Sequence, residues 1–125
     1  PLYAYLLIAA RQYEDKKYAG HYNVGPDEDG CSQTGRLVDL FCKHWGGKAN
    51  WINRWDGGPH EASFLKLDCS RMKATFGWQP VWTLEKAIEQ TIQWTKCYAA
   101  KGDVRACMEE QMADFFSSIQ ATPEA

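Results

Sequence analysis

The chain has 125 residues, a formal net charge of −2 at pH 7 and a hydrophobic fraction of 45%. This length predicts a single domain, and the hydrophobic fraction is high enough for a packed core. A slightly acidic chain without a basic stripe is not expected to bind nucleic acid, and no stretch is apolar and long enough to predict a membrane span.

The first predicted element is a helix that begins at Pro1, a residue favoured at the first helical position. Its apolar residues recur at helical spacing and mark one face of the helix. They are Leu2, Leu6, Ala9 and Tyr13. A chain that starts inside an apolar helix suggests a fragment, or a helix that docks on another surface. Residues 21–25 then predict a short strand, and residues 26–30 an acidic turn.

The middle of the chain mixes a helix with extended segments. Residues 34–45 predict an amphipathic helix that ends at a Gly-Gly pair. The alternating pattern of residues 49–54 predicts a second strand. Residues 56–61 have the sequence DGGPHE, and their two Gly and one Pro predict an irregular loop. This loop leads into a third predicted strand at residues 63–67.

Capping residues predict three helices in the remainder of the chain. Asp68 is the expected cap of a short helix that ends at Gly77. Thr83 is the expected N-cap of a longer helix that ends at Gly102. Asp103 then caps the last helix.

These elements predict an α+β fold that is mostly helical and has about three short strands. The strands are too few for a complete doubly wound sheet. Residues 1–119 are expected to form one lobe, and residues 120–125 a frayed tail.

Three sequence motifs carry a family resemblance. Residues 20–25, GHYNVG, resemble the G-x-x-Y-N-x-G strand of extended short-chain dehydrogenases that act on nucleotide sugars. Residues 66–80 resemble the segment of these enzymes that ends in L-G-W-x-P, here FGWQP. Residues 84–94 resemble their closing helix. The predicted fold is therefore similar to the C-terminal, substrate-binding lobe of this superfamily.

Two further segments narrow the resemblance to one family. Residues 59–68, PHEASFLKLD, resemble the P-H-E-A-x-Y/F-L-x-L-D segment of CDP-glucose 4,6-dehydratases. The added helix after Gly102, which includes QMADFF at residues 111–116, is also similar to the C-terminus of that family. The resemblance covers nearly the whole chain.

The resemblance implies a specific division of labour. The complete enzyme binds NAD in an N-terminal Rossmann lobe. It oxidises the sugar at C4, eliminates water across C5 and C6, and returns the hydride to C6. Its product is a 4-keto-6-deoxy CDP-sugar used for bacterial surface polysaccharide. The smaller C-terminal lobe closes over the CDP-sugar, as a second lobe at the open edge of a cofactor domain can do.

The catalytic parts of the family are expected to lie outside this chain. No Gly-rich turn of the dinucleotide-binding type occurs in it. Neither Tyr18 nor Tyr98 is followed by Lys at the fourth position, so the Tyr-x-x-x-Lys pair of the family is also predicted to be missing. We therefore expect no catalytic residue and no cofactor site here, because NAD belongs to the full-length family.

Four residues are candidates for substrate binding. His60 and Glu61 lie on the Gly/Pro loop, where His60 can donate to a phosphate or sugar oxygen; alternatively both pin the loop to a helix. Arg54 suits bidentate pairing with a diphosphate, or is an exposed surface residue. Asn23 touches ligand or, as often with Asn, bonds local backbone.

The thiols and imidazoles do not predict a metal site. Cys42 with His44, and Cys69 with His60, match no common structural zinc spacing, so no metal is expected. The chain has five Cys and no C-x-x-C, which indicates reduced thiols and a cytoplasmic protein.

The resulting prediction is a fragment of a CDP-glucose 4,6-dehydratase that contributes the CDP-sugar-binding lobe and is inactive alone. The alternative is a stand-alone module that binds a nucleotide sugar or associates with itself without catalysis. Expected partners are a CDP-sugar or nucleotide, the missing N-terminal lobe and a second copy in a homodimer. Neither nucleic acid nor a membrane is expected as a partner.

Overall fold

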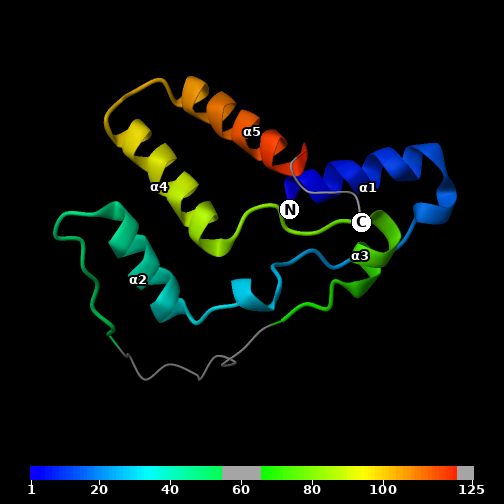
Figure 1. The fold of residues 1–125 in the computed structure, drawn as a ribbon, viewed down its shortest axis with the longest axis horizontal. Coiled ribbons are helices and arrows are strands. Elements are labelled where there is room, and N and C mark those ends of the chain that lie inside the picture. The colour runs from blue at the N-terminus through cyan, green and yellow to red at the C-terminus, as the bar shows by residue number, and fades with distance from the viewer. Residues whose placement is uncertain (55–65, 121–125) are drawn as a thin grey trace. The chain divides into compact units, whose positions relative to one another are not determined.

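The computed structural model describes residues 1–54 and 66–120, which form α-helices joined by irregular segments (Figure 1). Two short 3₁₀ turns, η1 and η2, occur in the first third. In chain order the elements are α1 (Leu2–Glu14), η1 (Lys16–Tyr18), η2 (Glu28–Gly30), α2 (Thr34–Trp45), α3 (Ser70–Phe76), α4 (Leu84–Ala99) and α5 (Val104–Gln120). No helix among these residues is long and apolar enough to cross a bilayer.

The predicted α+β fold is wrong, because no strand forms within residues 1–54 and 66–120. The expected strands at 21–25 and 49–54 have no regular secondary structure, and the third, at 63–67, lies mostly outside the described residues. Alternation along a sequence reports an extended segment with two unlike faces. It does not show whether a second segment pairs with this one through backbone hydrogen bonds. A β-strand exists only where such a partner is present.

The first compact unit comprises residues 1–31 and 66–80. Its core forms where Ala4 of α1 meets Met72 of α3 and Trp78, and all three are buried. Partly buried apolar residues surround this contact: Tyr3, Leu7, Ile8, Tyr22, Val24 and Phe76. This core therefore joins α1 to α3 and Trp78, elements about seventy residues apart in sequence, through side-chain packing.

The buried side of α1 is not the face marked by its larger apolar residues. Leu2 is 76% exposed, Leu6 is 70% exposed and Tyr13 is 95% exposed. The helix instead turns Ala4, with Leu7 and Ile8, toward the core. The predicted face of α1 is therefore an exposed apolar surface.

The second compact unit comprises residues 32–54 and 81–120, and α4 packs against both α2 and α5 within it. Ile88 and Ile92 of α4 and Cys107 of α5 are buried. Trp82 meets Phe115 of α5 edge to face, with ring centroids 5.2 Å apart. This aromatic contact adds to the packing around the buried residues of α4 and α5.

Two of the predicted helix ends are wrong: the N-cap of α3 is Cys69 rather than Asp68, and α4 ends at Ala99 rather than at Gly102. The other predicted caps are present. The Thr83 side chain accepts a hydrogen bond from the Lys86 amide at 3.2 Å at the start of α4, and Asp103 accepts one from the Ala106 amide at 3.0 Å at the start of α5. Gly77 ends α3 in the left-handed conformation, with φ of 61°. Gly46 ends α2 with φ of 80°.

Candidate functional site

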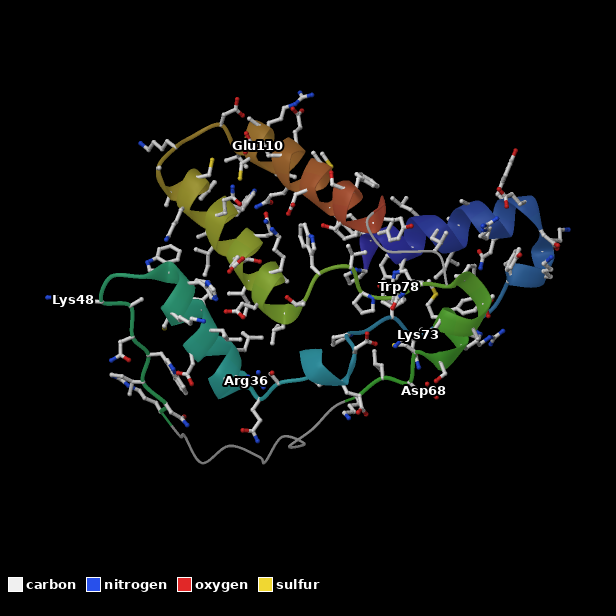
Figure 2. The ribbon with its side chains drawn as sticks, viewed as in Figure 1. Arg36, Lys48, Asp68, Lys73, Trp78 and Glu110 are labelled. Carbon is white, nitrogen blue, oxygen red and sulfur yellow. The ribbon has the colours of Figure 1, made fainter. Side chains whose placement is uncertain are left out.

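A hollow of about 440 Å³ lies in the first unit, between residues 26–31 and residues 66–73. Residues 26–31 directly follow the first family motif, residues 20–25. Residues 66–73 begin the second motif, residues 66–80. The lining residues are Pro26, Asp27, Glu28, Cys31, Lys66, Leu67, Asp68, Cys69, Ser70 and Lys73. Asp68 and Lys73 are labelled beside α3 in Figure 2.

Short polar contacts hold the two sides of the hollow together. The Asn23 side chain donates from Nδ2 to the backbone oxygen of Asp68 at 3.0 Å, across forty-five positions of sequence. The Asp68 carboxylate in turn accepts from the Ser70 amide at 2.9 Å. The Ser70 side chain, and then this amide, lower the pKa of Asp68. Asn23 thus bonds backbone that is distant in sequence, not the local backbone of the stated alternative, and its contact with ligand stays a prediction.

Two lysines and the carboxylates of Asp27, Glu28 and Asp68 line the hollow. Lys66 Nζ lies 2.7 Å from Glu28 Oε1, and Lys73 pairs with Asp27. The hydrogen bond from Lys66 lowers the pKa of Glu28, and the bond to Asp27 raises the pKa of Lys73. These shifts favour the charged forms of Glu28 and Lys73.

These ion pairs are weak because they face water. The side chains of Lys66, Lys73 and Asp27 are 42%, 44% and 44% exposed, and that of Glu28 is 88% exposed. Exposed pairs contribute about 0–1 kcal/mol each, so exchanging a carboxylate for a ligand phosphate costs little. Lys66 and Lys73 offer two ammonium groups to an anionic ligand, whereas the Asp68 carboxylate beside them would repel it.

Comparison with known proteins gives one strong similarity. Over 119 residues the chain is 32% identical to the CDP-glucose 4,6-dehydratase of Salmonella typhimurium, and the match covers 94% of this chain. The chain is homologous to part of a CDP-glucose 4,6-dehydratase. It spans about a third of the length of that relative, since the match covers 33% of it. A comparison with models of protein families finds no match.

The similarity confirms the family resemblance that the motifs indicate, and it leaves the predicted site residues untested. His60 and Glu61, the candidates on the Gly/Pro loop, lie outside the described residues. Arg54 is exposed and belongs to the second unit. Its pairing with a diphosphate stays a prediction.

One Tyr-x-x-x-Lys spacing does occur in this dehydratase-like chain, at Tyr13 and Lys17, contrary to the expectation that it has none. Two residues four apart face each other only on one continuous helix. Here α1 ends at Glu14, and Asp15 is extended with φ of −150°. Lys17 pairs with Asp15 at 3.1 Å, and Tyr13 is 95% exposed. The spacing therefore does not build the catalytic pair of the family.

The lysines of the hollow were missed at the sequence level. Lys66 and Lys73 lie within the second family motif, seven residues apart. The sequence gives no sign that residues 26–31 approach them, because that contact joins segments about forty residues apart. The local signal of this site is limited to one lysine shortly before α3 and one within it.

Proposed function

We propose that this chain is the CDP-sugar-binding lobe of a CDP-glucose 4,6-dehydratase and does not catalyse the reaction by itself. The observation that carries the proposal is the similarity over 94% of the chain to a third of such an enzyme. In this proposal NAD and the catalytic groups belong to the remainder of the enzyme. A cytoplasmic location is part of the proposal, and the five free cysteines support it.

The hollow in the first unit supports a role in holding the diphosphate of the ligand. Lys66 and Lys73 flank it, and Ser70 adds a hydroxyl donor. A diphosphate carries more negative charge than the single carboxylates that now pair with the lysines. It is therefore expected to displace Asp27 and Glu28, whose pairs with the lysines are exposed.

Calorimetric titration of the chain with CDP-glucose, CDP, cytidine and NAD tests this proposal. We expect heat with CDP-glucose and CDP, and none with cytidine or NAD, because the diphosphate supplies the interaction. The double variant Lys66→Gln with Lys73→Gln should weaken CDP binding about tenfold or more, whereas Lys48→Gln in the second unit should not. Absence of heat with millimolar CDP, or equal weakening by Lys48→Gln, would contradict the proposal.

The exposed apolar face of α1 supports a second part of the proposal, a docking role. Leu2, Tyr5, Leu6 and Tyr13 recur at helical spacing and are 76%, 58%, 70% and 95% exposed. Apolar patches of this kind mark interaction surfaces. We propose that the remainder of the dehydratase covers this face; a second copy of the chain is the alternative occupant.

Light scattering after size-exclusion chromatography separates the two occupants. A monomer that binds a separately expressed N-terminal lobe, and loses this binding in Leu6→Lys, supports docking to the remainder of the enzyme. A concentration-dependent dimer that Leu6→Lys converts to a monomer supports self-association. A monomer that binds no such lobe contradicts both.

A further inference from the structure

Three metal-ligating side chains meet in the second unit, and none of them lines the hollow of the first unit. His44 lies in the last turn of α2, and Glu85 and Glu89 lie one turn apart on α4. His44 Nε2 is 2.7 Å from Glu85 Oε1, and His44 Nδ1 is 3.3 Å from Glu89 Oε1. The imidazole thus has a carboxylate on each of its two nitrogens.

We propose that His44, Glu85 and Glu89 bind one divalent transition-metal ion, with zinc as the reference ion. One ligand atom from each residue lies within 4.8 Å of the other two. Ligand atoms around a tetrahedral zinc ion are about 3.3 Å apart when the bonds are about 2.0 Å long. Imidazole nitrogen and carboxylate oxygen are both accepted zinc ligands, and water completes the fourth position.

The arrangement combines a fixed ligand with two adjustable ones. The side chain of His44 is 18% exposed and held between packed helices, whereas those of Glu85 and Glu89 are 48% and 47% exposed. The glutamates can pivot onto an ion with little loss of packing, because each keeps its backbone in α4. Two of the three ligands share one helix at the spacing that puts them on one face.

Lys43 is the group that competes with a metal ion here. Its Nζ lies 3.0 Å from Glu85 Oε1, the same oxygen that faces His44. The Lys43 pair is exposed, so its loss costs little.

The site joins the end of α2 to the start of α4, so bound metal should cross-link the two helices. Its expected effect is a rise in the unfolding temperature with added zinc, because a ligand that binds only the folded chain stabilises it. This expectation does not depend on the proposed function. It concerns a different unit and a different class of ligand.

Calorimetric titration of chelator-treated chain with zinc chloride tests the proposal. We expect one zinc ion at this site, and Glu89→Gln and His44→Gln should each weaken its binding about tenfold or more. Lys43→Gln should tighten it by removing the competing cation. Asp114→Asn is the matched control: it breaks the 2.8 Å pair between α4 and α5 and should leave zinc affinity unchanged.

The free thiols do not confuse the outcome, because all four variants retain them. Equal zinc affinity in the wild-type and Glu89→Gln chains would mean that thiols or adventitious sites bind the ion, and would overturn the proposal. Absence of zinc binding by the wild-type chain would overturn it as well. Circular dichroism verifies that each variant is folded. If His44→Gln does not fold, the zinc affinity of Glu89→Gln tests the proposal, because Glu89 is half-exposed.

Discussion

Replacing Met72 by Ala should separate α1 from α3, since Met72 is fully buried in the core of the first unit. The substitution removes about three methylene-sized groups, worth about 0.8 kcal/mol each in transfer free energy, or about 2.4 kcal/mol in total. The cavity that remains adds to this cost, and such truncations span about 2–5 kcal/mol. We expect a loss of about 3 kcal/mol, a large part of the stability of a small domain.

Hydrogen exchange followed by mass spectrometry measures this loss element by element. A loss of about 3 kcal/mol should lower amide protection in α1 and α3 about 100-fold, because 1.4 kcal/mol is a factor of ten. The matched control is Met112→Ala, at a side chain that is 52% exposed, which should change stability by less than about 0.5 kcal/mol. Unchanged protection of α1 and α3 in Met72→Ala would refute the assignment of this core.

Three further predictions concern a cap, a carboxyl group and a thiol. The Thr83 hydroxyl caps α4, so Thr83→Ala should lower the free energy of unfolding in urea by about 1 kcal/mol, whereas Thr83→Ser should be nearly neutral. Equal losses of unfolding free energy in the two variants would contradict the cap. Lys43 and His44 lower the pKa of Glu85 from its ordinary value of 4.5. The ionised Glu85 carboxylate therefore stabilises the folded chain fully above pH 4.5, and this contribution is lost as the pH falls through the lowered pKa. The unfolding midpoint should therefore drop in acid less steeply for Glu85→Gln than for the wild-type chain, and superimposable profiles would argue against the pairing. Burial, and secondarily Cys97, raises the pKa of the Cys107 thiol above its ordinary value of 9.0. Iodoacetamide should therefore alkylate Cys107 more slowly than the half-buried Cys31. Peptide mass spectrometry compares the two alkylation rates, and equal rates would be inconsistent with the burial of Cys107.

The helix boundaries were predictable because the signals that set them are local. Thr83 and Asp103 bond to amides three residues ahead, and Gly46 and Gly77 adopt positive φ angles where their helices end. Each of these interactions is complete within one turn of chain. The sequence pattern of one turn is therefore enough to predict it.

The strands and the core of α1 were not predictable, because both depend on distant residues. Asn23 meets Asp68 through a side chain, and no backbone ladder forms between the described parts of these two segments. In α1 the buried residue is Ala4, whose small side chain makes little contribution to an apolar pattern. The residues that marked the predicted face, such as Leu2, Leu6 and Tyr13, lie on the exposed side of the helix.

The sequence pointed to the two motifs next to the candidate site, but not to the side chains that line it. The family resemblance led to residues 20–25 and 66–80, and the similarity to a dehydratase confirms the resemblance. The lysines that charge the hollow were missed because residues 26–31 complete it from a distance. The cluster of His44 with Glu85 and Glu89 was missed for the same reason: only the packing of α2 on α4 brings them together.

The most direct test of the central claim is the hydrogen-exchange footprint of CDP on the intact chain. If the chain is the CDP-sugar-binding lobe, saturating CDP should protect peptides that cover residues 26–31 and 66–73, and should leave α5 unchanged. The protection should disappear in the Lys66→Gln, Lys73→Gln double variant. An exchange pattern that CDP does not alter at these two segments would contradict the claim.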